Sequence, residues 1–357
     1  MRAVAGVLAR GAAVLCFAAL LLGAGVSPAS AHGRGSDATN FRSTILSAPT
    51  ADGLRWRVLG GDAQLELDNR GSRDVVVLGL QGEPYLRIGP RGAFENRRSP
   101  TVPLQRERYA VAGMDVMDHG EHDPAAKPEW VRVSETPRWA WHDHRIHWMS
   151  PRTPDVDGET VLIPRWEVPV LVAGTPAVVT GELRWIPAPS PLPWLAAGLA
   201  LALPALWGLR RPRPDDGDSW PAAVRPAAVV LALAALLNVV HLADDAVAPG
   251  PPGARAAAAF QTLLYLGLAL GGAWRARRGD YAGVTAMAIG SGALFLGQGL
   301  LYLPVLTASQ IGHGTPDGLL RLAVGISLAQ LGPVGFVAWR VGRVVQPDQA
   351  AGEPRAS

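Results

Sequence analysis

Cysteine is almost absent from this 357-residue sequence, and the one thiol, Cys16, lies in an apolar stretch near the N-terminus. That stretch, residues 12–22, follows a basic start and precedes Ala-Ser-Ala at residues 29–31, a pattern typical of a signal peptide and its cleavage site. We therefore predict cleavage after residue 31, with an uncleaved anchor as the alternative. The mature chain would begin at His32 without a thiol, which excludes disulfides, thiolate metal ligands and cysteine nucleophiles.

Lysine is nearly as scarce, because Lys127 is the single lysine and arginine supplies the other basic residues. The formal net charge of +3 would suit a nucleic-acid partner only if the basic residues were concentrated on one domain. They are distributed along the chain, so we predict no nucleic-acid partner. The sequence also lacks a phosphate-binding P-loop, a Rossmann fingerprint, a nucleophile-elbow serine and an H-E-x-x-H motif, which argues against common nucleotide-dependent and hydrolytic enzymes.

Residues 32–187 contain short β-branched or alternating segments separated by turns rich in glycine and proline. In the last segment, Val179 and Leu183 lie on one face and Thr180 and Glu182 on the other. We predict an extracytoplasmic all-β domain, an immunoglobulin-like sandwich, with residues 114–137 as a long loop. The predicted strands are 54–59, 63–68, 74–80, 85–88, 160–163, 166–172 and 177–186.

Residues 188–343 contain five apolar stretches near the length that crosses a bilayer, at 193–209, 223–243, 256–274, 282–305 and 319–340. Arginines follow the first, third and fifth stretches, whereas the other two connections have few basic residues. By the positive-inside rule, the β domain is then extracytoplasmic and residues 344–357 form a cytoplasmic tail. We predict a multi-pass plasma-membrane protein, an α-helical transmembrane bundle with the lipid bilayer as its partner.

The segment Trp-Ala-Trp-His-Asp-His-Arg-Ile-His-Trp-Met, at residues 139–149, carries three histidines within six positions. We take His142, His144, His147, Asp143 and Met149 as candidate metal ligands, since imidazole suits Cu, Zn or Ni. In an extended chain His142 and His144 would share one face, and His147 would join them through a bend. The alternative is a structural cluster of histidine and tryptophan in the core of the domain.

A second group of candidate ligands lies upstream and comprises Met114, Met117, His119 and His122. Thioethers with imidazoles can bind both oxidation states of copper, which makes these residues a secondary metal site. The alternative for this segment is a solvated acidic loop.

After cleavage, His32 would offer an amine and an imidazole on one residue, a chelate that favours Cu(II). This arrangement resembles the start of CopC-type periplasmic copper proteins, whose mature chains begin with histidine on an immunoglobulin-like sandwich. The resemblance covers His32, the predicted sandwich and the pair Asp143-His144, and it implies copper as the bound metal. A disordered terminus without a site is the alternative.

The whole chain also resembles a family of uncharacterised actinobacterial membrane proteins. The similar segments are residues 32–33, 82–90, 94–96, 141–145, 147–149 and 183–185. This resemblance implies an architecture of signal peptide, β domain and C-terminal transmembrane helices, and it implies no activity.

The predicted helices carry polar residues near one side of the membrane, the side of the β domain: Asn238, His241, Gln261, Gln298 and Tyr302. Polar groups inside a membrane are costly, so they mark either interhelical hydrogen bonds or a ligand or ion site. Both interpretations stay open for this membrane polar cluster.

Taken together, these patterns predict a membrane-anchored extracytoplasmic metal-binding protein for copper handling or homeostasis, with another copper protein of the cell envelope as candidate partner. The main alternative is a structural or interaction protein of the envelope. An enzyme that uses the same histidines is the least favoured hypothesis, because no recognisable general acid–base pair accompanies them.

Overall fold

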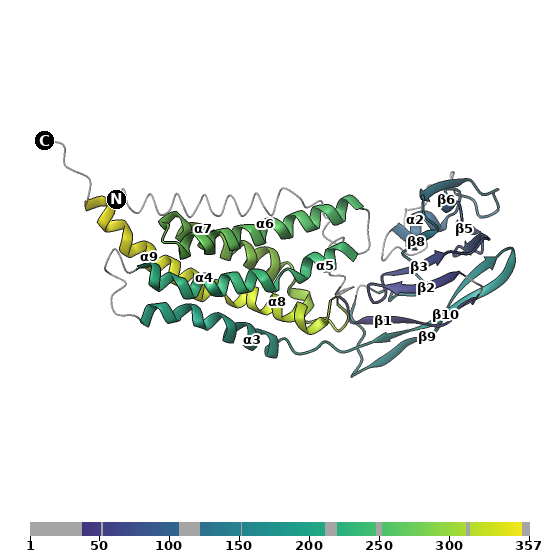
Figure 1. The fold of residues 1–357 in the computed structure, drawn as a ribbon. Coiled ribbons are helices and arrows are strands. Elements are labelled where there is room, and N and C mark those ends of the chain that lie inside the picture. Colours follow the sequence, from purple (N-terminus) through teal and green to yellow (C-terminus); the bar gives the residue numbers. More distant parts are fainter. Residues whose placement is uncertain are drawn as a thin grey trace. The chain divides into compact units, whose positions relative to one another are not determined.

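The computed structural model describes residues 38–50, 53–106, 122–150, 152–210, 220–247, 252–311 and 315–351. The chain divides into two compact units (Figure 1), a β domain within Asp37–Ala188 and Ala308–Ile311, and a helical unit that includes the described residues of Pro189–Thr307 and those from residue 315 on. The predicted signal peptide and His32 lie outside the described residues.

The described residues of the β domain form ten strands in two antiparallel sheets, which confirms the predicted all-β domain. The larger sheet has the order β1-β10-β9-β4-β5-β6-β7 and the smaller one β2-β3-β8. The strands are β1 (Phe41–Ser47), β2 (Leu54–Leu59), β3 (Gln64–Asn69), β4 (Val75–Leu78), β5 (Pro84–Gly89), β6 (Gly92–Asn96), β7 (Trp130–Ser134), β8 (Arg138–Trp141), β9 (Thr160–Val172) and β10 (Thr175–Trp185).

Both sheets contribute to one apolar core. Leu65 and Leu67 of β3 pack in the same cluster as Val168 of β9 and Leu183 of β10, and all four are fully buried. Alternation along the strands produces this core, because every second side chain points to the same face.

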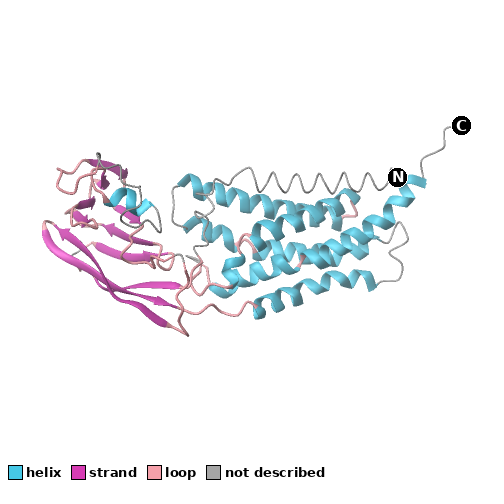
Figure 2. Cartoon of the chain, turned by 180° about the vertical axis from the view of Figure 1, so that it is seen from behind, coloured by secondary structure: helices cyan, strands magenta, loops and turns pink. Residues whose placement is uncertain are grey.

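Five of the described elements of the β domain were not predicted, namely the strands β1, β6, β7 and β8 and one short helix. The prediction of a loop over residues 114–137 was wrong for β7, which pairs with β6 at the edge of the larger sheet. An edge strand with largely accessible side chains leaves little alternating hydrophobicity in the sequence. The short helix is α2 (Thr101–Arg106), which has six residues and lies among the strands of the β domain in Figure 2.

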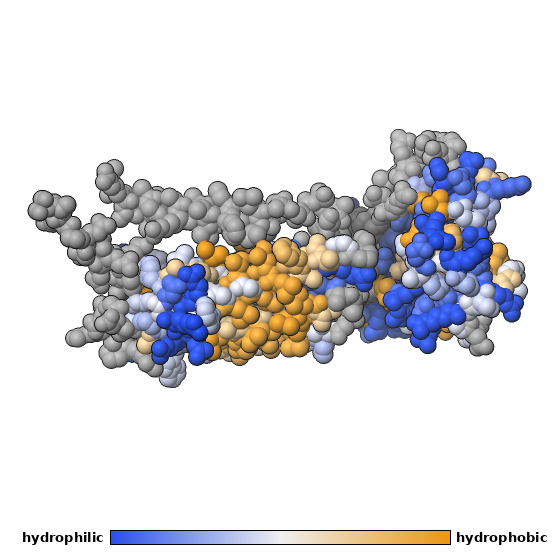
Figure 3. All heavy atoms as spheres, turned by 45° about the horizontal axis from the view of Figure 1, so that its top comes forward, coloured by the Kyte–Doolittle hydropathy of each residue, from blue (hydrophilic) through white to orange (hydrophobic). Residues whose placement is uncertain are grey.

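In the part of the helical unit that the structure describes, five helices are long and apolar enough to cross a membrane, as predicted: Leu192–Arg210, Trp220–Asp245, Arg255–Arg277, Tyr281–Leu300 and Asp317–Arg343. Figure 3 shows a broad apolar surface over this unit, with hydrophilic residues gathered at one of its ends. The component elements are α3 (Leu192–Ala202), η2 (Leu203–Arg210), α4 (Trp220–Leu237), α5 (Val240–Val247), α6 (Pro252–Arg277), α7 (Tyr281–Leu294), η3 (Phe295–Leu300), η4 (Leu303–Leu306), α8 (Asp317–Ala329) and α9 (Leu331–Ala351).

Four spans are irregular rather than continuous α-helices, and the first changes from α3 to the 3₁₀ helix η2 at Leu203. The second breaks at Asn238 and Val239 between α4 and α5, and the fourth ends in the π-helix η3. The fifth changes from α8 to α9 at Gln330. Apolar length predicts a span, but it does not predict where the helix inside that span is broken.

Tryptophan and arginine pair at the last turns of three spans. The guanidinium carbons of Arg210, Arg278 and Arg343 lie 5.1, 4.0 and 5.2 Å from the ring centroids of the tryptophans three or four residues before them. Those rings, Trp207, Trp274 and Trp339, are more than half exposed. Exposed tryptophan beside arginine is typical of a membrane–water interface.

Helices α6 and α7 approach each other closely because glycine lies at their contact. A Cβ added to Gly290 would lie 2.6 Å from the Cα atom of Ala269, and one on Gly272 would lie 2.6 Å from the carbonyl carbon of Ala286. Small residues of this kind allow helix backbones to pack tightly in membranes.

We expect Gly290→Ala to destabilise the full-length protein in detergent by about 1–3 kcal/mol, because the added methyl group overpacks the contact with α6. Gly292→Ala, on the same helix, is the matched control, since its Cβ would have nothing within 4 Å. Unfolding followed by circular dichroism at 222 nm measures both. Equal loss of stability in the two variants would contradict the close-packing argument.

Candidate metal centre

The three histidines of the candidate site lie on a turn that follows β8. Trp141, the last residue of that strand, pairs with Leu65 of β3, and the chain then leaves the sheet. The Asp143 carboxylate accepts a hydrogen bond from the Arg145 backbone N–H at 3.1 Å, and the Asp143 carbonyl accepts one from Ile146 at 3.1 Å. These two bonds close a tight turn of the kind that aspartate favours.

The turn brings His142, His144 and His147 together. One ligand nitrogen from each ring can be chosen so that all three lie within 4.8 Å of one another. Three atoms this close together have a common point that lies about 2.8 Å or less from each of them. Metal–nitrogen bonds are 2.0–2.1 Å long, so small rotations of the histidine side chains would bring the three nitrogens to bonding distance of one ion. Among the described residues this is the one group of three or more His, Cys, Asp or Glu side chains that meets this criterion.

Backbone carbonyls select the tautomer of two of these rings. His142 Nδ1 lies 2.8 Å from the Ala63 carbonyl oxygen, and His147 Nδ1 lies 2.9 Å from that of Trp148. A carbonyl oxygen only accepts, so each Nδ1 carries the proton and donates it. The lone pair of each neutral ring is therefore on Nε2, which is the arrangement that orients histidine for a metal ion.

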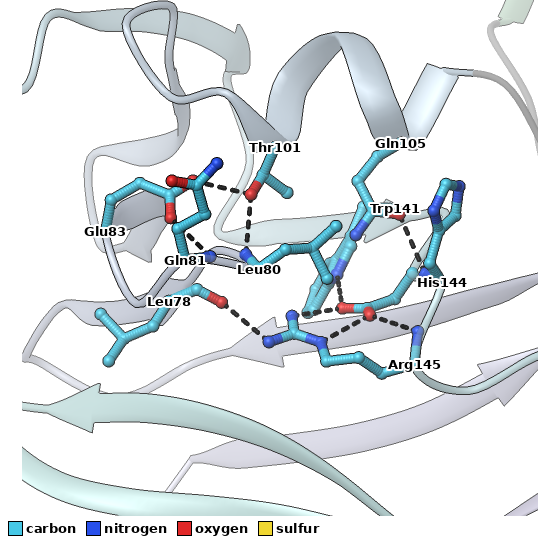
Figure 4. A network of polar contacts seen from close by, with 10 residues as sticks. Leu78, Leu80, Gln81, Glu83, Thr101, Gln105, Trp141, His144 and Arg145 are labelled. Atoms are coloured by element: carbon cyan, nitrogen blue, oxygen red, sulfur yellow. Dashed lines mark hydrogen bonds and ion pairs between the residues drawn. The ribbon is translucent and has the colours of Figure 1, made fainter. Parts of the chain in front are cut away.

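A buried ion pair between Asp143 and Arg145 supports the turn, and Figure 4 shows the hydrogen bonds of the Arg145 side chain. Arg145 donates from Nε to Asp143 Oδ1 and from Nη2 to Oδ2, both at 2.8 Å. The same guanidinium donates to the Leu78 carbonyl at 3.1 Å, and the Trp141 indole donates to Asp143 Oδ2 at 3.0 Å. Burial would raise the pKa of Asp143, but the charge and hydrogen bonds of Arg145 hold it below its ordinary value.

His144 is held from a different element, α2. Its backbone N–H donates to Gln105 Oε1 at 2.9 Å. Helix α2 is itself tied to the loop before β5, because Thr101 donates to the buried Glu83 carboxylate at 2.7 Å and accepts from the Leu80 N–H at 2.8 Å (Figure 4). Sequence reasoning missed Gln105, since this contact spans 39 positions and no local pattern indicates it.

The other candidate ligands have different outcomes. Asp143 uses both carboxylate oxygens for Arg145 and Trp141, so its role in this structure is to support the turn. Met149 is half-buried two residues after His147, and His122 is half-buried outside the group of three histidines. Met114, Met117, His119 and His32 lie outside the described residues.

The membrane polar cluster is buried in the helical unit. Asn238 and His241 are fully buried, Gln298 is 1 % exposed and Tyr302 is 4 % exposed. Gln261 is half-buried and donates to the Tyr265 hydroxyl on the same helix. Interhelical hydrogen bonding, one of the two interpretations, is present where Asn238 donates to Ser327 Oγ at 2.8 Å.

No protein-family model, curated protein or solved structure matches this chain. The functional argument therefore depends on the geometry of the site, and the two family resemblances stay predictions.

We expect Arg145→Ala to destabilise the protein by about 3–5 kcal/mol, because it leaves the fully buried Asp143 carboxylate without its counter-charge. Arg165→Ala is the matched control, since Arg165 pairs with Glu167 at the surface, where an ion pair contributes about 0–1 kcal/mol. Unfolding of the full-length protein in detergent, with hydrogen exchange across residues 138–150, measures the effect. A loss no larger than that of the control would show that the ion pair does not support the turn.

Proposed function

We propose that this chain is a membrane-anchored extracytoplasmic metal-binding protein that handles copper. The observation that carries the proposal is the convergence of His142, His144 and His147, with ligand atoms within 4.8 Å of one another. The carbonyl contacts that orient two of the rings support it, because a metal-binding histidine usually donates its second nitrogen to such an acceptor.

Copper is favoured by the chemistry of the donors. Three neutral nitrogen donors without a thiolate form a site for a divalent transition metal, and the affinity of such sites peaks at Cu(II). The predicted mature N-terminus would add the amine and imidazole of His32, and Met149 lies close in sequence to supply a softer ligand for Cu(I).

The helical unit would anchor the metal-binding domain in the plasma membrane. The three tryptophan–arginine pairs lie at the ends of the first, third and fifth spans, which alternate in direction with the other two. The positive-inside rule makes that end cytoplasmic and the β domain extracytoplasmic, the compartment in which a copper-handling protein would meet the ion or a partner copper protein.

Titration of the full-length protein in detergent with Cu(II), against a competing chelator, tests the proposal. We expect one sub-micromolar site, and we expect His142→Ala combined with His147→Ala to weaken it by roughly 100-fold or more, since even loss of a supporting residue costs 10–100-fold. His122→Ala is the matched control and should bind as the wild type does. Electron paramagnetic resonance should show nitrogen hyperfine coupling that the double variant loses.

A structural role for the histidines predicts other results. In that case Cu(II) would bind weakly or equally well to the double variant, and a chelator would leave the melting temperature unchanged. Either result would contradict the proposal and favour an envelope interaction protein with a histidine–tryptophan core.

A further inference from the structure

The helical unit contains a set of buried polar side chains that are not part of the proposed copper site. Thr262 of α6 donates to Asp245 Oδ2 of α5 at 3.1 Å, and Gln298 Nε2 of η3 donates to Thr262 Oγ1 at 3.3 Å. All three side chains are at most 2 % exposed. A chain of two hydrogen bonds thus connects an amide, a hydroxyl and a carboxylate that come from three different spans.

The direction of these bonds determines how the Gln298 amide is oriented. The Thr262 hydroxyl has one proton and donates it to Asp245, so it can only accept from Gln298. The Gln298 nitrogen must therefore face Thr262. Its oxygen, Oε1, is buried without a hydrogen-bond partner among the described residues.

Asn238 is constrained in the same way. Its Nδ2 donates to the Ala234 carbonyl at 2.7 Å and to Ser327 Oγ at 2.8 Å. The Ala234 carbonyl can only accept, and the Ser327 hydroxyl donates to the Ala323 carbonyl, so the amide cannot be turned around. Its oxygen, Oδ1, is also buried and has no hydrogen-bond partner in the described part of the chain.

His241 follows Asn238 by three residues and precedes Asp244 and Asp245 by about one helical turn. It is fully buried, and its ring packs against Tyr302 with centroids 4.2 Å apart. Neither ring nitrogen has a hydrogen-bond partner within the described ranges. A neutral imidazole adds one more acceptor to the two amide oxygens.

The second span supplies Asn238 and His241, the fourth supplies Gln298, and the helix is irregular near these residues in both spans. The break between α4 and α5 falls at Asn238, and Gln298 lies inside the π-helix η3. Broken transmembrane helices and π-bulges concentrate at ligand and ion sites, where the chain gives up regular hydrogen bonds to present polar groups.

We propose that Asn238, His241, Asp245, Thr262 and Gln298 form a binding site for a hard monovalent cation. The atoms that would bind the cation are mainly oxygens, from a carboxylate, two amides and a hydroxyl. Oxygen ligands suit a hard cation such as sodium or potassium better than they suit copper. Asn238 Oδ1, Gln298 Oε1 and the acceptor nitrogen of His241 are buried without a hydrogen-bond partner among the described residues, and such acceptors are costly in a membrane unless positive charge or a donor complements them. The described residues of this region also lack the group of three close His or carboxylate ligands that defines the candidate copper centre.

Charged and titratable residues occur on α5 and on the elements packed around it. They include Asp244 on α5 itself, Arg255 and Tyr265 on α6, Asp317 and Arg321 on α8, and Tyr302 after η3. Arg321 donates to the Val305 carbonyl at 3.3 Å and lies 3.9 Å from Asp317.

Equilibrium binding of radioactive sodium and rubidium to the full-length protein in detergent tests this inference. We expect saturable binding of one ion, and a higher melting temperature in sodium or potassium chloride than in choline chloride at equal ionic strength. Asp245→Asn should abolish both effects. Asp317→Asn is the matched control, because it makes the same chemical change at a half-exposed residue that is outside the hydrogen-bonded chain.

Two further variants cover the case in which Asp245→Asn does not fold. Gln298→Leu should weaken ion binding at least tenfold, whereas Gln298→Glu, which keeps an oxygen at this position, should retain it. Absence of saturable binding in the wild type, or equal binding in Gln298→Leu, would overturn the inference. Loss of copper binding through the histidine variants should leave sodium binding unchanged, so the two proposals fail independently.

Discussion

The ion pair between Asp143 and Arg145 lies under a turn where the chain has just left a β-sheet and no ladder of hydrogen bonds remains to hold it. Each carboxylate oxygen of Asp143 accepts more than one hydrogen bond, from Arg145 and from either the turn backbone or Trp141. Ile146, between two of the histidines, is fully buried in the core of the domain. The convergence of the three imidazoles depends on this combination of a buried charge pair and an apolar anchor.

The support of the histidines then extends outward through separate parts of the domain. Ala63, before β3, orients the His142 ring, and Gln105 of α2 holds the His144 backbone. Buried polar groups of this kind require complete hydrogen bonding, because an unsatisfied one is costly in a medium of low dielectric constant. The site is thus a local sequence cluster that distant residues bring into one geometry.

The two polar sites of the chain are surrounded by different environments. In the β domain, the oxygen atoms that hold the histidine turn accept hydrogen bonds from His142, His144 and Arg145, whereas Gln105 Nε2 is buried without a hydrogen-bond partner among the described residues. In the helical unit, the amide nitrogens of Asn238 and Gln298 donate hydrogen bonds, and their amide oxygens are buried without a hydrogen-bond partner among the described residues. The chain also returns to the β domain after the fourth span, where Gln310 pairs with Thr39 through two backbone hydrogen bonds.

Local patterns in the sequence were sufficient for the class of architecture and for the residues of the candidate centre. Apolar length alone indicates the five spans, alternation indicates strands such as β10, and three histidines in six positions are visible without any fold. Such features depend on residues close in the chain, so elementary periodicity identifies them. Strands β1, β6, β7 and β8 and helix α2 were missed. Strand β7 and helix α2 depend on partners distant in sequence.

What the tertiary structure alone decided is how the chemistry is arranged. The sequence by itself determined that histidine, and no thiol, is available for metal binding, and that amides and a histidine lie within the apolar spans. It did not determine that Asp143 supports the turn, that His142 Nδ1 donates to the Ala63 carbonyl, or that the Gln298 oxygen is buried without a hydrogen-bond partner in the described part of the chain. Asp143 meets Arg145 only two residues away, whereas the contacts that orient His142, Asn238 and Gln298 cross 36 to 89 positions of chain. Packing and the cost of burying an unsatisfied polar group decide all of these contacts.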